Sequence, residues 1–162
     1  MESSKIMEST NQLCDNHKLT ILYRHSRDGE NFRKLCNHKG PTIAVGKVSG
    51  AEEILGGYNP VLLLDNKCNR DEYKYFSTNE SFIFALYKNM DEDIVSFVYN
   101  SSQAICDNID RFPIFGNGFD LHFGSEKYKP AASRKGAYQF PIRSSSDIFE
   151  WDDWEVFLVS KA

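Results

Sequence analysis

Short segments rich in β-branched and aromatic residues recur along this chain, and turn residues separate them. The clearest are TIAVGKV (residues 42–48), ESFIFALY (80–87), DIVSFVY (93–99) and WEVFLV (154–159). Such segments favour β-strands, because branched and aromatic side chains pack well on a pleated surface. Long helical patterns do not alternate with them, so a parallel sheet of strand–helix–strand units is not expected. The pattern predicts a mostly β fold, a two-layer antiparallel β sandwich with a few short helices.

The first third of the chain fits the same plan. Residues 19–24 (LTILYR) predict one further strand. The segment 52–60 (EEILGGYNP) predicts another, which runs into Gly56-Gly57 and forms a hairpin with residues 42–48. Phe32, Leu35 and Cys36 have the spacing of one helix face, which predicts a helix of about two turns. We expect Asp28 to cap its start and Gly40, followed by proline, to end it. Residues 61–75 are expected to form a charged surface loop.

Length and composition limit the class of protein. A chain of 162 residues with 41% hydrophobic residues suits one domain with a true core. We expect residues 1–17 to be a polar, flexible segment and residues 18–162 to be the folded domain. The net charge of −4 argues against a nucleic-acid binder, because neutralising phosphates requires a basic surface. No apolar run is long enough to cross a bilayer, and residues 1–17 lack the apolar core of a secretory signal. We therefore expect a cytoplasmic protein.

The stretch IFGNGFDLHF (residues 114–123) raises the question of a phosphate-binding glycine loop. A dinucleotide fingerprint needs a third glycine three positions after Gly118, where this chain has Leu121. The residues that follow alternate with a period of two, which indicates a strand rather than a helix. Asn117-Gly118 between apolar residues is a typical two-residue hairpin turn. The glycines Gly116 and Gly118 are therefore expected to shape a turn and not to bind phosphate.

Two glutamates and a histidine are the candidate catalytic residues. Glu80 and Glu155 each lie at the edge of an apolar strand face, where burial raises the pKa of a carboxyl group and allows general acid catalysis. His122 is a candidate general base, although nothing in the sequence pairs it with a nucleophile. The alternative for both glutamates is structural: each caps a strand end, accepts bonds from backbone N–H groups or pairs with an arginine.

The cysteines are widely spaced, and we expect free thiols in a reducing compartment. They are Cys14, Cys36, Cys68 and Cys106. Cys68, flanked by Lys67 and Arg70, is the candidate for a reactive thiol of low pKa. Cys36 and His38 are too close together for a standard zinc pair, so we expect no metal site and no cofactor.

Six motifs in order resemble the TLDc domain family, whose members include the oxidation-resistance proteins. They are LYRHSRDGENF, CNHKGPT, EILGGYNP, ESFIFAL, FGNGFDL and WEVFLV, and the resemblance extends over residues 19–159. It implies a β sandwich with short helices, in which the GGY and FGNG motifs form turns. The positions that match family motifs with a structural role are Gly56, Gly57, Tyr58, Phe115, Gly116, Gly118, Asp120 and Trp154.

The resemblance also implies a function. No reaction is firmly attached to the family, which implies a non-enzymatic, monomeric domain that binds a protein partner. The implied roles are protection against oxidative stress and binding to the vacuolar proton-pumping ATPase, whose assembly several members control. Such a domain is expected to lack a deep polar pocket. The alternative is a hydrolase-like or redox enzyme that uses Glu80 and Glu155, which match acidic family positions, or a reactive cysteine. Residues 61–64 depart from the family pattern, which usually has tryptophan there.

Overall fold

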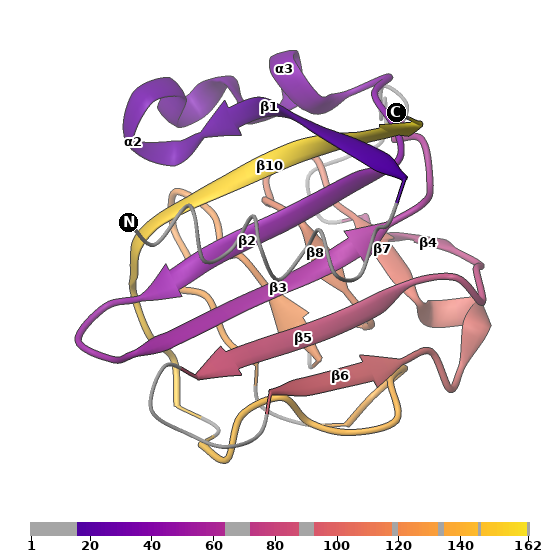
Figure 1. The fold of residues 1–162 in the computed structure, drawn as a ribbon, viewed down its shortest axis with the longest axis vertical. Helices are drawn as coiled ribbons and strands as arrows, with labels where there is room; N and C mark the ends of the chain where they lie inside the picture. Colours follow the sequence, from indigo (N-terminus) through magenta and orange to yellow (C-terminus); the bar gives the residue numbers. More distant parts are fainter. Residues whose placement is uncertain are drawn as a thin grey trace.

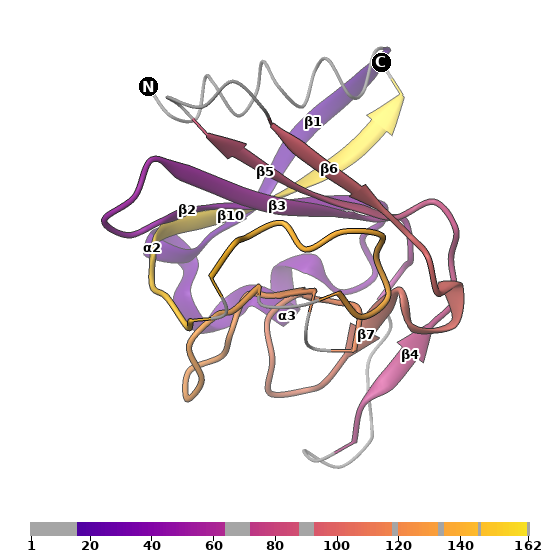
Figure 2. The ribbon, with the colours of Figure 1, turned by 90° about the horizontal axis from the view of Figure 1, so that it is seen from below.

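The computed structural model of the chain describes residues 16–63, 72–87, 93–117, 120–132, 135–145 and 147–161. The strands form a large sheet and a small sheet, which lie in two layers (Figure 2). The strand pairs of both sheets are antiparallel. The predicted two-layer antiparallel sandwich is thus confirmed.

The large sheet has the strand order β1-β10-β2-β3-β5-β6 (Figure 1). Its strands are β1 (His17–Arg24), β2 (Thr42–Val48), β3 (Glu53–Asn59), β5 (Phe82–Tyr87), β6 (Ile94–Phe97) and β10 (Trp151–Lys161). The β2–β3 hairpin is the one that the sequence predicts. β10 lies between β1 and β2, so the C-terminal strand completes the sheet next to the N-terminal one.

The small sheet has the order β4-β7-β8-β9. Its strands are β4 (Lys74–Phe76), β7 (Ile105–Asp107), β8 (Ile114–Phe115) and β9 (Leu121–His122). The surface loop predicted over residues 61–75 is wrong at its end, because Lys74 and Tyr75 pair with β7. Residues 64–71 of that prediction lie outside the described residues. β8 and β9 form the hairpin expected around FGNG, but residues 116–120 connect them instead of a two-residue turn.

The described helices are short. They are α2 (His25–Asp28), η1 (Gly29–Asn31), α3 (Phe32–Cys36) and η2 (Ser101–Gln103). Phe32 and Cys36 are buried on α3, as the helical spacing predicts. The helix is shorter than expected, and Asp28 does not cap it. The Asp28 carboxylate instead accepts a hydrogen bond from the Arg24 backbone N–H at 2.9 Å.

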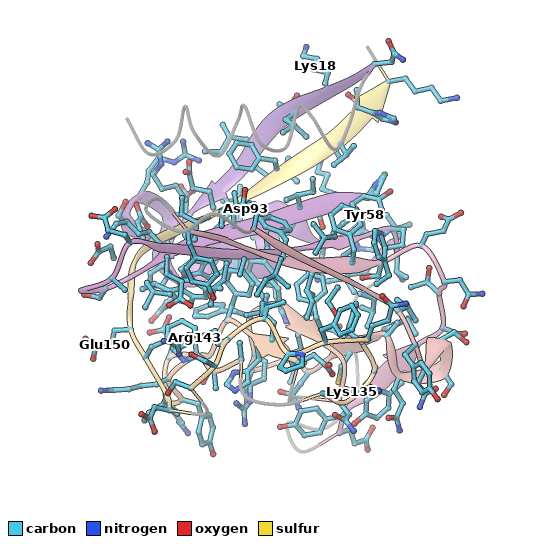
Figure 3. All side chains as sticks on the ribbon, turned by 60° about the horizontal axis from the view of Figure 1, so that its bottom comes forward. Lys18, Tyr58, Asp93, Lys135, Arg143 and Glu150 are labelled. Atoms are coloured by element: carbon cyan, nitrogen blue, oxygen red, sulfur yellow. The ribbon has the colours of Figure 1, made fainter. Side chains whose placement is uncertain are left out.

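The main core lies between the two sheets, where side chains fill the space between the layers (Figure 3). Trp154 on β10 is 1% exposed and lies at the centre of an aromatic cluster. The ring centroids within 5.8 Å of its own belong to Tyr23, His25, Phe32, Phe112 and Phe123. These rings come from β1, α2, α3 and the loops around β8 and β9, so Trp154 joins the last strand to elements throughout the chain.

Gly56 and Gly57 lie inside β3 and not in a turn, contrary to the expectation from the family motif. A Cβ atom on Gly56 would stand 2.4 Å from the ring of Phe84 on β5. A Cβ atom on Gly57, which faces the other side of the sheet, would stand 2.6 Å from the ring of Phe115 on β8. The glycines therefore make room for one phenylalanine on each face, and the Phe115 contact brings the two sheets together.

Replacing Gly57 with alanine is expected to lower the free energy of unfolding by about 1–3 kcal/mol. The added methyl group overlaps the Phe115 ring, and both residues are buried, so one sheet must shift. Urea denaturation of Gly57→Ala and of Gly50→Ala measures the effect. An added methyl group at Gly50 would meet open space, but the residue has a φ of +74°. The loss of stability in Gly50→Ala therefore measures backbone strain without overpacking. The double variant Gly57→Ala with Phe115→Leu should regain part of the stability, and no such recovery would count against the overlap.

Candidate functional site

Glu155 is held by an ion pair. It is 9% exposed on β10, next to Arg24 on the neighbouring strand β1. Arg24 donates from Nε at 3.1 Å and from Nη2 at 2.8 Å to Oε2 of Glu155. The side chain of Glu155 is therefore engaged in a salt bridge between neighbouring strands. Pairing with an arginine is the structural role that the sequence leaves open for this residue.

Glu80 does not approach Glu155. It is exposed on the loop that precedes β5, and its backbone N–H donates to Thr78 Oγ1 at 3.1 Å. β2 and β3 lie between β5 and β10 in the large sheet. With strands about 4.8 Å apart, three strand spacings separate the two glutamates across the sheet. They cannot act on one substrate bond as an acid–base pair.

Asp120 is a buried carboxylate that ties a loop to the β8–β9 hairpin. Its Oδ1 accepts hydrogen bonds from the N–H groups of Gly136 at 2.9 Å and Tyr138 at 3.2 Å, and its Oδ2 accepts one from Ala137 at 2.8 Å. Burial raises the pKa of Asp120, and these three N–H donors oppose the shift. Gly116, at φ +79°, lies against the same carboxylate, since a Cβ there would stand 2.0 Å from Oδ2. The role of Asp120 in this structure is structural. Gly118 lies outside the described residues.

The described cysteines are Cys36 and Cys106, and both are buried free thiols. Burial raises the pKa of each to about 12, with a smaller contribution from the nearest aspartates. Thiols of such pKa stay protonated and unreactive near neutral pH. The candidate reactive thiol Cys68 lies outside the described residues, as does Cys14.

His122 on β9 lines an open hollow of about 280 Å³ on the small sheet, which we call the His122 hollow. The other lining residues are Tyr73, Tyr75, Arg111, Ile114 and Asn117. Nδ1 of His122 and Oδ1 of Asn117 are buried and have no hydrogen-bond partner among the described residues. Burial first, and then the charge of Arg111, lowers the pKa of His122 to about 4. The imidazole is therefore neutral at physiological pH.

A larger hollow of about 490 Å³ adjoins the His122 hollow and shares Tyr73 and Arg111 with it. On its wall, Arg33 pairs with the buried Asp107 at 2.5 Å and donates to the Ile109 carbonyl at 2.9 Å. Arg111 lies over the Tyr128 ring, with 3.9 Å between its Cζ atom and the ring centroid. Both hollows are open to the surface and are lined by polar and apolar side chains together.

The described residues hold no group of three or more histidine, cysteine, aspartate or glutamate side chains that could bind a metal ion. Within the same residues, no helix has the length and apolar character that a membrane crossing requires. The sites described above are a paired carboxylate, a buried structural carboxylate, two buried protonated thiols and two open hollows.

A comparison with protein families matches the TLDc domain over residues 1–160, nearly the whole chain. The chain belongs to the TLDc domain family. The match includes residues 1–17, which the sequence led us to separate from the folded domain. A search of curated proteins found no match.

Within this TLDc domain, the described family-motif positions are mainly interior residues. Gly57 and Phe115 touch across the two sheets, Asp120 ties the hairpin to a loop, and Trp154 fills the core. Sequence reasoning named His122 but missed Arg111 and Asn117 as its neighbours in the hollow. Asn117 lies in the FGNG motif, where it was interpreted only as a turn residue. No local sequence pattern identifies Arg111 as a site residue. It lies beside the hollow only once the small sheet has formed.

Proposed function

We propose that this TLDc domain is a non-enzymatic protein-interaction domain. The observation that carries the proposal is a group of exposed aromatic side chains at the outer edge of the large sheet, which we call the β6 patch. It consists of Phe97, Tyr99 and Phe140, which are 53%, 72% and 56% exposed. Exposed aromatic side chains that lie together are typical of protein-binding surfaces, because aromatic rings act as anchors in partner pockets.

The β6 patch is supported by packed rings and by a backbone hydrogen bond. Phe97 ends a row of rings across three strands, with centroids 5.3 Å apart between Tyr58 and Phe82 and 6.2 Å apart between Phe82 and Phe97. The Gln139 N–H donates to the Phe97 carbonyl at 2.9 Å, which holds Phe140 beside the strand. A rigid anchor loses little conformational entropy when it binds, so this surface favours association with a preformed partner.

Lys135 adds a charge to the patch. Its Nζ atom lies 4.6 Å from the centroid of the Tyr99 ring, and the residue lies on a loop on the small-sheet side of the molecule (Figure 3). A cation held against an aromatic ring gives the patch a polar rim, as binding surfaces commonly have. The separated glutamates and the protonated thiols supply no comparable support for an enzyme.

For the partner, we propose the vacuolar proton-pumping ATPase, and for the cellular role, protection against oxidative stress. Membership of the TLDc domain family supports both assignments, since the family resemblance implies them. Affinity purification from a cell extract with the full chain as bait tests the partner. Recovery of ATPase subunits is the expected result, and no recovery by the unmodified chain would remove this partner from the proposal.

A patch variant tests the surface in the same extract. Tyr99→Ala combined with Phe140→Ala should reduce the amount of captured partner about tenfold or more, because interface aromatics often contribute 2 kcal/mol or more to binding. Ile148→Ala is the matched control. Ile148 is 63% exposed and lies away from the β6 patch. Its neighbour Asp147 bonds to Arg143, and Arg143 pairs with Glu53. Glu53 stands at one end of β3, and Tyr58, in the row of rings behind the patch, stands near the other end. Equal capture by the patch variant and the control would count against the β6 patch.

A further inference from the structure

The His122 hollow carries chemistry that the β6 patch does not use. The Arg111 backbone N–H donates to the Asn108 carbonyl at 3.0 Å. Its guanidinium forms no ion pair and donates no hydrogen bond within the described residues, and it lies against the face of the Tyr128 ring. Stacking on a ring orients a guanidinium while leaving its N–H edge available. A guanidinium that is oriented and unpaired beside a hollow is a ready donor for a planar anionic group.

His122 contributes a second donor. Since Nδ1 is buried without a described partner, Nε2 is the ring nitrogen that remains to meet a ligand or solvent. A neutral imidazole carries one proton, and the proton is better placed on the nitrogen that can share it. We assign that proton to Nε2, so that the ring can donate Nε2–H to a ligand in the hollow and adds no second positive charge. Asn117 contributes amide hydrogens, one of which bonds to Gln103 Oε1 at 3.3 Å.

The charge and size of the hollow select the ligand. Arg111 is the sole cation among the six residues that line it, which suits one carboxylate better than a doubly charged phosphate. Tyr73 and Tyr75, each 45% exposed, form aromatic walls on which the aliphatic part of a ligand can pack. The volume of about 280 Å³ admits a group the size of one or two amino-acid side chains.

We propose that the His122 hollow binds a carboxylate, with Arg111 and the Nε2–H of His122 as donors and the two tyrosines as walls. The carboxylate belongs to a small organic acid or to an acidic residue of a polypeptide. The proposal is independent of the β6 patch and of the vacuolar ATPase, because it concerns a different face of the domain.

Titration with N-acetyl-glutamate amide, followed by ¹H–¹⁵N NMR of the full chain, tests the proposal. Chemical-shift changes that saturate with the probe are expected at Asn117, at His122 and at the side chain of Arg111. The neutral N-acetyl-glutamine amide has the same shape and should bind at least tenfold more weakly, because it lacks the charge that Arg111 recognises. Equal binding of the two probes, or no saturable shift with either the single residue or a peptide, would overturn the proposal.

Charge variants locate the interaction. Arg111→Gln should weaken the binding of the glutamate probe about tenfold or more, and Arg111→Lys should retain part of it. Arg27→Gln is the control, because Arg27 is exposed and already paired with Asp28 at 2.8 Å. The NMR spectra report directly whether each variant is folded. Unchanged affinity in a folded Arg111→Gln variant would contradict the proposal.

A peptide arm separates the two sources of the carboxylate. The probe is acetyl-Gly-Glu-Gly-amide, compared with the single acylated glutamate at the same pH and salt. Tighter binding of the peptide by about tenfold assigns the hollow to a polypeptide ligand. Equal affinity assigns it to small organic acids, because flanking residues then add nothing. Either result supports recognition of a carboxylate.

Discussion

Asp120→Ala is expected to lower the free energy of unfolding by about 3 kcal/mol, because it leaves several buried N–H groups without acceptors. The affected donors are the backbone N–H groups of Gly136, Ala137 and Tyr138. Each hydrogen bond to a charged acceptor contributes roughly 1.5–3 kcal/mol to stability. The total loss is smaller than the sum of the three bonds, because the variant no longer has to bury a carboxylate. For a chain of this length, the melting temperature should fall by about 6–12 °C.

Thermal and urea denaturation of Asp120→Ala measure this effect. Asp147→Ala is the matched control, because Asp147 is exposed and its carbonyl, not its carboxylate, accepts the bond from Arg143. The control should change the free energy of unfolding by less than about 0.5 kcal/mol. The free energy of unfolding of Asp120→Asn should lie between those of the two variants, since one amide oxygen remains to accept hydrogen bonds. A loss in Asp120→Ala no larger than that of the control would show that the loop does not depend on this carboxylate.

Trp154→Ala is expected to lower the free energy of unfolding by about 3–5 kcal/mol, the largest effect of any substitution considered. The side chain is 1% exposed, and its removal opens a cavity among five rings from separate elements. These rings cannot all move inward, because Tyr23 is tied by its hydroxyl to the Gly29 carbonyl at 2.6 Å. The cavity should therefore persist rather than collapse.

Chemical denaturation followed by far-ultraviolet circular dichroism measures the loss for Trp154→Ala. Phe140→Ala is the control, since it deletes an aromatic ring that is 56% exposed and should cost less than about 0.5 kcal/mol. The same measurement on Tyr99→Ala combined with Phe140→Ala shows whether the β6 patch variant remains folded. Trp154→Phe should restore about half of the loss by filling part of the cavity. If Trp154→Ala and Phe140→Ala unfolded at the same denaturant concentration, Trp154 would not be the centre of the core.

Local sequence patterns identified only part of the candidate site. The sequence identified His122 as a candidate site residue, and this residue lines the His122 hollow. Tyr73, Arg111 and Asn117 also line the hollow, but the sequence did not identify them as candidates. Tyr73 is far from the others in the chain and reaches the hollow only when β4 joins the small sheet. The two glutamates show which of two alternatives the structure selects. Both sit at strand edges in the sequence, yet one pairs with Arg24 and the other is exposed on a loop.

The amino-acid sequence by itself determined the strands of the large sheet. Thr42–Val48 is a strand from end to end as predicted, because alternation and branched side chains act locally on the backbone. It also determined the β2–β3 and β8–β9 hairpins, since their strands are close in the chain and joined by turn residues.

Only the tertiary structure decided the roles of the glycines and of Asp120. Gly56 and Gly57 carry the composition of a turn, but they lie in a strand because Phe84 and Phe115 need the space that a Cβ atom would occupy. β8 ends at Phe115 and β9 begins at Leu121, a longer separation than an Asn-Gly turn predicts. Asp120, just before β9, accepts hydrogen bonds from the N–H groups of residues 136–138. Contacts between distant segments outweigh local preference at these positions, because steric overlap and unpaired buried groups cost more than a turn propensity contributes.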